Sequence, residues 1–146
     1  MKLYVASSWK NDYELDEIHY MLREAGHITY DFRDHGRSDD FQEIAKFDWK
    51  LLDKADGVVL VLPSNQSSHI EAGVAIGSQR PVFITWVSEH KYEPMYLWAN
   101  AYVPKEELVE AIERYLPSLI HDEYAYGKPC HGMCSEENCQ CKVGAI

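Results

Sequence analysis

Uninterrupted apolar runs alternate along the chain with segments of helical periodicity. The longest run, Gly57 to Leu62, contains no polar side chain. Such a run is typical of a strand that is covered on both faces of a parallel sheet. Shorter runs of the same kind predict strands at 3–6, 27–32 and 82–87, and a short edge strand at 102–103. Between the last two strands, residues 89–100 form an aromatic-rich and irregular stretch, with a short helix starting at Pro94.

Four segments place apolar residues three and four positions apart, which predicts amphipathic helices at 13–25, 41–55, 69–77 and 104–116. Gly26 suits the position after the first helix. Pro104 suits the first position of the last helix, which is expected to end before Pro117. Strands and helices that alternate in this way predict an α/β fold, a flavodoxin-like or Rossmann-like parallel sheet of four or five strands with helices on both faces.

The alternating pattern ends near residue 119, which divides the chain into two parts. Residues 1–119 are expected to form the α/β domain, and residues 120–146 a Cys-rich appendage without a hydrophobic period. A chain of 146 residues suits one domain of this size. Within the domain, residues 33–40 are too polar for the core and are expected to form a flap.

Charge and composition restrict the partners of the protein. The net charge is −10, with 24 acidic and 14 basic residues. Such a surface repels nucleic acid polymers and anionic membranes, so neither is an expected partner. No apolar run approaches the length of a membrane span, and the chain starts without a signal peptide, so we expect a cytoplasmic protein.

A carboxylate follows the longest apolar run. If the next helix begins near His69, with Ser67 or Ser68 as N-cap, then Glu71 lies in its first turn. A glutamate there offsets the helix dipole, which is an ordinary structural role. Gly73 costs helix stability, however, so something close-packed or bound is expected beside it. Since ligands of open α/β sheets bind at the carboxyl ends of the strands, Glu71 is a candidate nucleophile or base.

Three groups of residues together resemble a known family. They are the opening segment 3–8, the segment 47–49 followed by 55–56, and above all 62–63 followed by Ser67-Ser68-His69-Ile70-Glu71-Ala72-Gly73. These motifs resemble the nucleoside 2-deoxyribosyltransferase superfamily. That group contains transferases that exchange the bases of 2′-deoxyribonucleosides and relatives that hydrolyse the N-glycosidic bond of nucleoside 5′-monophosphates. The resemblance covers about residues 1–116.

The resemblance implies roles for individual residues. Glu71 matches the glutamate that attacks the anomeric carbon and forms a glycosyl-enzyme ester, and Tyr4 matches a tyrosine that orients it. Asp48 matches an aspartate near the base or its leaving nitrogen, and Ser68 matches a residue that contacts the sugar or the 5′ group. Asn65 departs from the family pattern, because many transferases carry an aspartate at this position. An amide cannot relay a proton as an aspartate can. This departure weakens the case for base exchange.

The chemistry of N-glycoside cleavage fits these assignments. An ionised Glu71 can stabilise oxocarbenium character at the sugar and then capture it covalently. The base leaves more easily when protonated, so a general acid is expected. Asp48 is the best candidate, with His35 and His69 as alternatives. The two carboxyl groups should differ in environment, so that one is ionised and the other is protonated.

Further substrate-binding candidates follow the first and third strands. Ser7, Ser8 and Lys10 after the first strand, and residues 64–68 after the third, are candidates for a phosphate cradle. The alternative is that these serines only cap helices. Trp9 is a candidate for stacking on a nucleobase, with core packing as the alternative.

The family is commonly oligomeric, with residues of one subunit closing the site of its neighbour. The resemblance therefore implies a homo-oligomer, and Asn100 is a candidate for such a residue. An aromatic stretch that contains Tyr92, Met95, Tyr96 and Trp98 is a candidate subunit interface.

The appendage has a chemistry of its own. All four cysteines lie close together, at Cys130, Cys134, Cys139 and Cys141. Thiolates so close are candidate ligands of a structural zinc ion, with His121 or His131 as spare ligands. The alternative is a tail of free thiols, because the spacings are not those of common zinc ribbons. Disulfides are not expected in a reducing compartment.

The sequence thus predicts an enzyme that needs no cofactor for catalysis. Its expected activity is cleavage or transfer at the N-glycosidic bond of a 2′-deoxynucleoside or its 5′-monophosphate, through a covalent intermediate on Glu71. Two alternatives stay open. One is a hydrolase of another ribosyl N-glycoside, such as a nicotinamide dinucleotide. The other is a module on the same fold that binds or senses nucleotides without turnover.

Overall fold

The computed structural model describes residues 1–36 and 38–125, with side chains up to residue 116. Met1–Ile112 form one compact unit, and the chain from Glu113 onward forms a second. The predicted boundary at residue 119 stays a prediction. The four cysteines and their predicted zinc site lie outside the described residues.

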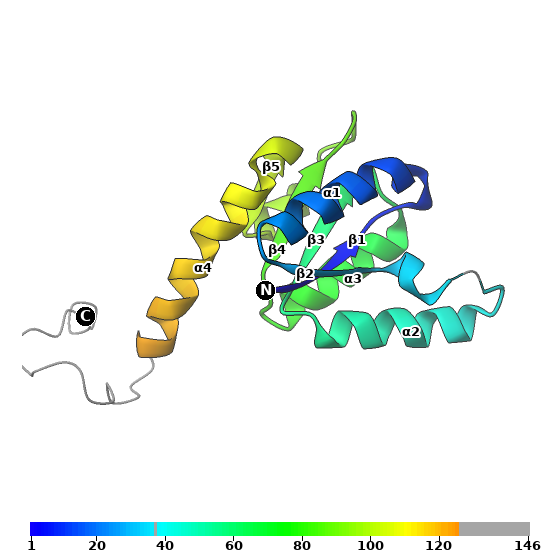
Figure 1. Ribbon diagram of the computed structural model, residues 1–146, viewed down its shortest axis with the longest axis horizontal. Coiled ribbons are helices and arrows are strands. Elements are labelled where there is room, and N and C mark those ends of the chain that lie inside the picture. The colour runs from blue at the N-terminus through cyan, green and yellow to red at the C-terminus, as the bar shows by residue number, and fades with distance from the viewer. Residues whose placement is uncertain (37, 126–146) are drawn as a thin grey trace, which may run out of the picture. The chain divides into compact units, whose positions relative to one another are not determined.

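A sheet of five parallel strands forms the centre of the first unit, in the order β2-β1-β3-β4-β5 (Figure 1). This order is that of the flavodoxin-like fold, as predicted. The strands are β1 (Lys2–Ala6), β2 (Ile28–Asp31), β3 (Gly57–Leu62), β4 (Val82–Trp86) and β5 (Ala101–Pro104).

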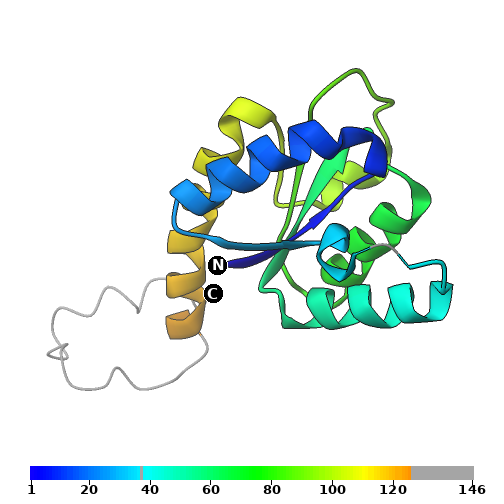
Figure 2. The ribbon, with the colours of Figure 1, turned by 45° about the vertical axis from the view of Figure 1, so that its right-hand side comes forward.

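Helices cover both faces of the sheet. Figures 1 and 2 show α1 on one side and α2 and α3 on the other. The α-helices are α1 (Asp12–Glu24), α2 (Phe41–Lys54), α3 (Gln66–Gly77) and α4 (Leu108–Ala125). Short 3₁₀ helices join them to the strands: η1 (Trp9–Asn11), η2 (Phe32–His35), η3 (Pro94–Trp98) and η4 (Lys105–Glu107). Among the described residues, none of these helices is long and apolar enough to cross a membrane.

The start of α3 differs from the sequence prediction. The helix begins at Gln66, because the side chain of Asn65 is the N-cap and accepts a hydrogen bond of 2.9 Å from the Ser68 amide. Neither Ser67 nor Ser68 is the cap. Glu71 is consequently the sixth residue of the helix and lies in its second turn. Compensation of the helix dipole, which acts within the first turn, does not explain this glutamate.

The last helix also differs from the prediction. Pro104 pairs with Trp86 as the final residue of β5, in an extended conformation, and so does not start a helix. One 3₁₀ turn follows, and α4 begins at Leu108. The helix continues through Pro117 to Ala125, although a proline inside a helix removes one backbone hydrogen bond.

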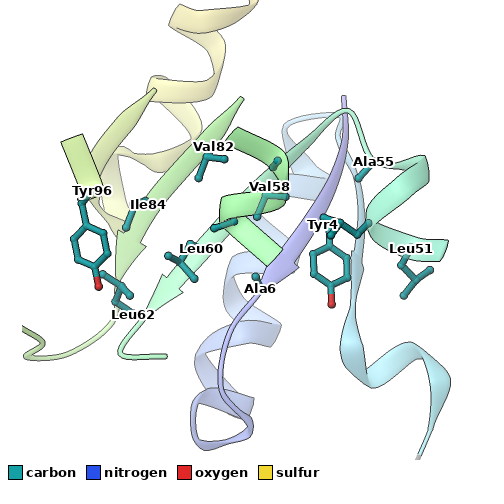
Figure 3. Close-up of a cluster of buried hydrophobic side chains, with 13 residues drawn as sticks. Tyr4, Ala6, Leu51, Ala55, Val58, Leu60, Leu62, Val82, Ile84 and Tyr96 are labelled. Carbon is teal, nitrogen blue, oxygen red and sulfur yellow. The ribbon is translucent and has the colours of Figure 1, made fainter. Parts of the chain in front are cut away.

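A cluster of buried apolar side chains fills the layer between the sheet and the helices α2 and α3 (Figure 3). Alternate residues of the strands point into it, for example Tyr4 and Ala6 of β1 and Leu60 of β3. All six residues of β3 are buried, as its uninterrupted apolar sequence predicted. Gly57 starts this strand because a Cβ there would lie only 2.8 Å from the Pro81 carbonyl oxygen.

Candidate active site

A cavity of about 520 Å³ opens at the carboxyl ends of β1, β2 and β3. The chain passes from β1 outward to β2 and then returns to β3 on the other side of β1, so this is the topological switch point of the sheet. Ligands of such sheets bind at this point. The cavity is lined by Ser7, Trp9, Phe32, His35, Gly36, Ser38, Asp39, Phe41, Ile44, Asp48, Asn65, Ser67, Ser68 and Glu71.

Glu71 and Tyr4 form a hydrogen-bonded pair at the base of the site. Tyr4 lies on β1 with its side chain fully buried, and its hydroxyl donates to Glu71 Oε1 at 2.9 Å. Figure 3 shows the Tyr4 ring on the face of the sheet covered by α2. Burial and the charge of Glu71 raise the pKa of the Tyr4 phenol well above its ordinary value, so the hydroxyl stays a donor. The pair joins the first strand to the third helix.

Burial, helped by the negative charge of Asp48, raises the pKa of Glu71 to about 7 against the opposing effect of the hydrogen bond from Tyr4. The pKa of Glu71 rises because a carboxyl group removed from water favours its neutral form. A carboxyl with a pKa near neutrality that faces a cavity is a candidate catalytic group.

Asp48 enters the same cavity from the middle of α2. Its Oδ1 is buried and has no hydrogen-bond partner within the described part of the chain. Burial raises the pKa of Asp48, and the charge of Asp31 acts in the same direction, while His35 opposes it. An unpaired buried oxygen costs about 1–3 kcal/mol. A substrate group that bonded to it would remove this cost.

His35 shares the surroundings of Asp48. It ends η2, lines the cavity, and packs edge-on against Phe47 with ring centroids 5.5 Å apart. Its Nδ1 is buried and also lacks a hydrogen-bond partner among the described residues. The structure therefore brings one imidazole and two carboxyl groups together in one cavity.

Two buried serines clamp the loops on either side of the cavity. The Ser7 hydroxyl donates to the Val61 carbonyl at 3.1 Å and accepts a bond from Asn11. The Ser68 hydroxyl lies 2.8 Å from the Ser7 carbonyl and 2.9 Å from Asn65 Oδ1. Both serines line the cavity, and their predicted contact with a substrate stays a prediction. Their hydrogen bonds join the segment after β1 to β3 and to the segment after it. These bonds give Ser7 and Ser68 a structural role, although not the helix-capping role that was the stated alternative.

One wall of the cavity is apolar. Trp9 packs edge-on against Phe32 with ring centroids 4.6 Å apart, and Phe41 and Ile44 come from the first turns of α2. Trp9 is half exposed, which leaves part of its ring open to the cavity side. Such a wall suits the flat face of a nucleobase.

The connection after β2, where a flap was expected, is held by a network of hydrogen bonds. Asp31 caps η2 through the Arg33 amide and also accepts bonds from the Arg33 side chain. His19 of α1 lies 2.7 Å from the same carboxylate and 2.6 Å from the Thr29 hydroxyl. Arg33 extends to Asp12 and Asp16 on α1. We call His19, Asp31 and Arg33 the β2 hub.

The β2 hub has a defined charge. The hydrogen bonds from His19 and Arg33 outweigh burial and lower the pKa of Asp31 to about 2. Arg33 is correspondingly held protonated, because Asp31 raises its pKa. The Asp31 carboxylate of the hub disfavours ionisation of Asp48.

Several predicted residues lie outside the cavity lining. Ser8 caps η1 by accepting a bond from the Lys10 amide. His69 turns away, with Nδ1 2.8 Å from the Asn65 carbonyl and Nε2 2.9 Å from the Tyr96 hydroxyl, so it is not a candidate acid in this unit. Asn100 accepts a bond from the Val82 amide at the opposite end of the sheet. Its predicted role in a neighbouring subunit stays a prediction.

The expectation of a close contact at Gly73 is wrong for this unit. A Cβ added there would meet nothing within 4 Å, and the residue is exposed on the outer side of α3. Tyr96, predicted to lie in an interface, is buried in the unit itself. Within the described residues no group of three histidine, cysteine or acidic side chains is arranged to hold a metal ion.

The residues that shape the site without chemistry of their own were not predicted from the sequence. Phe32, Phe41 and Ile44 were assigned to a strand or to a helix face, and the β2 hub was not recognised. The one available signal was the charged run after a predicted strand, Asp31-Phe32-Arg33-Asp34-His35, which marks a strand end near the ligand edge of the sheet.

Comparisons with known proteins agree with the architecture. No protein-family profile matches the chain, and no curated protein sequence matches it either. Among solved structures, a 2-deoxyribosyltransferase from Bacillus psychrosaccharolyticus is similar with a TM-score of 0.61 and 21% identity, over 79% of this chain and 92% of that chain. A CMP N-glycosidase from Clostridium botulinum has a TM-score of 0.56 and 15% identity, over 77% and 99%.

A third structure, a conserved protein from Enterococcus faecalis V583, has a TM-score of 0.63 and 16% identity, over 79% of this chain and 98% of that chain. These likenesses confirm the predicted fold.

Proposed function

We propose that the protein belongs to the nucleoside 2-deoxyribosyltransferase superfamily and breaks the N-glycosidic bond of a 2′-deoxynucleoside or its 5′-monophosphate. The observation that carries this proposal is the Tyr4–Glu71 pair at the switch point of the sheet, whose Glu71 lines the same cavity as Asp48. The fold shared with a 2-deoxyribosyltransferase and a CMP N-glycosidase supports it.

In the proposed first step, a carboxylate oxygen of ionised Glu71 attacks the anomeric carbon of the sugar. The carbon–nitrogen bond breaks, and its electron pair leaves with the base. Asp48 is the proposed acid that protonates the departing base, and its raised pKa favours the protonated form that this role needs. Tyr4 holds the attacking carboxyl group in place through its hydrogen bond.

In the second step, an acceptor attacks the anomeric carbon and the ester bond to Glu71 breaks. Water as acceptor gives hydrolysis, and the nitrogen of a second base gives transfer. Asp48, now ionised, takes the proton from the acceptor. Asn65 supports water as the main acceptor, because its side-chain oxygen caps α3 and an amide cannot relay a proton.

Incubation with deoxynucleosides and deoxynucleotides, with and without a free acceptor base, tests the proposal by chromatography of the released base. Release without an acceptor means hydrolysis, and release only with an acceptor means transfer. Binding without turnover would refute the proposal in favour of a sensing module. Turnover of a nicotinamide dinucleotide alone would favour the alternative function, a hydrolase of another ribosyl N-glycoside.

The nucleophile is tested separately. We expect Glu71→Gln to lower kcat/KM by roughly 1,000-fold or more, because an amide cannot form the ester. Glu107→Gln, on exposed η4, is the matched control and should keep full activity. Mass spectrometry of the acid-quenched reaction should detect the glycosyl adduct on the unsubstituted protein and not on the variant. A fully active Glu71→Gln protein would overturn the assignment.

A further inference from the structure

The segment that follows β3 lines two cavities. Four of its residues line the candidate active site: Asn65, Ser67, Ser68 and Glu71. His69 and Ser64 line a smaller cavity of about 220 Å³, together with Tyr96 of η3. His69 thus lies on the helix that carries the proposed nucleophile, but its side chain points into a different cavity. Any effect of His69 on the proposed reaction is therefore indirect.

The side chain of His69 joins the start of α3 to η3. Its Nδ1 atom lies 2.8 Å from the Asn65 carbonyl oxygen, and its Nε2 atom lies 2.9 Å from the Tyr96 hydroxyl. Because a carbonyl oxygen only accepts, Nδ1 carries a proton and donates it to this hydrogen bond. In the neutral imidazole, Nε2 then accepts the hydrogen bond from the Tyr96 hydroxyl.

Tyr96 is a fixed point for this connection. It is buried, and Figure 3 shows it as a member of the apolar cluster beside the sheet. Its ring stacks on His69 and on Tyr102 of β5, with ring centroids 5.8 Å apart in both pairs. The imidazole of His69 is consequently held both by a hydrogen bond and by ring packing.

Asn65 connects His69 to the candidate active site. Its side-chain oxygen accepts a hydrogen bond of 2.9 Å from the Ser68 amide, and its carbonyl oxygen is bound by the His69 imidazole. The His69 backbone amide lies 3.4 Å from the same carbonyl oxygen, which is long for such a bond. The imidazole therefore makes the shorter of the two hydrogen bonds that fix the backbone of Asn65.

We infer that His69 is a positioning residue of the candidate active site, which acts through Asn65 and is itself held by Tyr96. Its effect on turnover rests on the proposed function. Without the imidazole, the wall formed by residues 65–68 loses one of its attachments to the rest of the protein. A displacement of about 1 Å in a group that positions a substrate can cost about 100-fold in rate.

The test compares kcat and KM of His69→Phe with those of the unsubstituted protein. This substitution keeps an aromatic ring and removes both hydrogen bonds of the imidazole. We expect KM for the deoxynucleoside or deoxynucleotide that is turned over to rise by about tenfold, because the wall then holds the substrate less well. Partial unfolding of the variant would instead lower the apparent kcat and leave KM unchanged.

A second variant and a matched control make the test specific. Tyr96→Phe removes only the outer hydrogen bond, and it should raise KM by a smaller factor even if His69→Phe does not fold. His90 is the control, because its Nδ1 lies 3.2 Å from the Ser88 carbonyl oxygen and its Nε2 lies 2.6 Å from the Tyr102 hydroxyl. His90 is not part of the described lining of the candidate active site, so His90→Phe should leave KM unchanged. An unchanged KM in folded His69→Phe, or an equal rise in His90→Phe, would overturn the inference.

Hydrogen exchange tests the positioning role without turnover. The Ser68 amide, which is bound to Asn65, should exchange at least about tenfold faster in His69→Phe and at an unchanged rate in His90→Phe. If the unsubstituted protein turns over no deoxynucleoside or deoxynucleotide, the proposed function fails, and faster exchange at Ser68 still supports the positioning role. Unchanged exchange at Ser68 in His69→Phe would overturn that role whether or not the protein is an enzyme.

Discussion

Two carboxyl groups with different surroundings define the site at the scale of residues. Glu71 has a fixed hydrogen-bond donor in Tyr4, whereas the Oδ1 atom of Asp48 is buried without a partner among the described residues. The hydrogen bond from Tyr4 offsets part of the effect of burial on the pKa of Glu71, whereas the Asp48 oxygen has no such donor. The proposed mechanism assigns the nucleophile to the carboxyl group with the fixed donor and the acid to the one without it.

The first prediction concerns the pH dependence of turnover. Glu71 must be ionised to attack, so kcat/KM should fall as the pH drops through about 7, the pKa to which burial raises Glu71. The Tyr4 hydrogen bond lowers that pKa, and Tyr4→Phe removes the bond. We therefore expect the acid limb of the pH profile to move to higher pH by roughly one unit or less.

The pH–rate profile of Tyr4→Phe against that of the unsubstituted protein is the measurement. An acid limb that moved to lower pH in Tyr4→Phe would contradict the conclusion that the Tyr4 hydrogen bond lowers the pKa of Glu71. Tyr30→Phe removes a phenol from the neighbouring strand, outside the cavity lining, and serves as the control with an unshifted profile.

The second prediction concerns stability. The pKa of Glu71 is about 7 when folded, above its ordinary value of 4.5, so ionised Glu71 destabilises the fold. The penalty is absent below about pH 4.5, grows as the pH rises, and is complete above pH 7. Glu71→Gln should therefore raise the free energy of unfolding by about 1–3 kcal/mol at pH 8 and by much less at pH 5.

Urea denaturation of both proteins at the two pH values measures this difference. A variant that was less stable at pH 8 would show that the Glu71 carboxylate is stabilised in the folded protein, contrary to the pKa inferred from its burial.

At the scale of elements, the β2 hub determines where η2 lies. Asp31 closes β2, caps η2 and binds both His19 of α1 and Arg33. The segment that carries Phe32 and His35 into the cavity is thus attached to a strand and a helix. We expect its position to be set by the hub before substrate binds.

The third prediction is that Asp31→Asn destabilises the protein by about 2–4 kcal/mol at pH 7, because it removes the buried carboxylate that binds both His19 and Arg33. Since the pKa of Asp31 is lowered to about 2, its stabilising effect is present above pH 3.8 and is lost as the pH falls toward 2. Urea denaturation should therefore find most of the difference still present at pH 4.5.

Asp16→Asn is the control for the hub, because Asp16 binds the same arginine from an exposed position. An exposed ion pair contributes little, so this variant should stay within about 0.5 kcal/mol of the parent protein. Equal effects of the two substitutions would argue against the hub as the anchor of η2.

At the scale of the whole molecule, exposed apolar side chains gather on and near η3. Met95, Leu97 and Trp98 are 51%, 77% and 65% exposed, which is unusual for three large apolar residues within four positions. Such groups mark interaction surfaces. They are consistent with the predicted homo-oligomer, because the aromatic stretch that contains η3 was the predicted subunit interface.

The fourth prediction tests this assembly. If η3 forms the interface, Leu97→Glu should lower the molar mass measured by light scattering to that of the monomer, because a buried unpaired charge is costly. Tyr20→Glu changes a comparably exposed residue, 66% exposed, on α1 and should leave the mass unchanged. A parent protein that is already a monomer would refute the homo-oligomer.

The hydrophobic pattern was sufficient to predict the order and type of the elements. The six apolar residues of β3 identified the central strand, and alternation of strands with helices identified a parallel sheet. Element ends were less predictable. The start of α3 depends on which of several adjacent polar side chains caps the helix. Asn65 is the cap because its side chain accepts a hydrogen bond from the Ser68 amide, and the hydrophobic periodicity does not predict this bond.

The sequence by itself determined the layered fold and, through family motifs, the identities of Tyr4, Asp48 and Glu71 as candidates. Only the tertiary structure decided which side chains share a cavity and which make their hydrogen bonds within the protein. The sequence alone does not distinguish Ser7 and Ser68 from serines whose hydroxyl groups are free to bind a ligand. In the structure, their hydrogen bonds join two segments that lie 61 positions apart in the chain. Hydrogen bonds between distant segments depend on packing in three dimensions, and local composition carries no record of that packing.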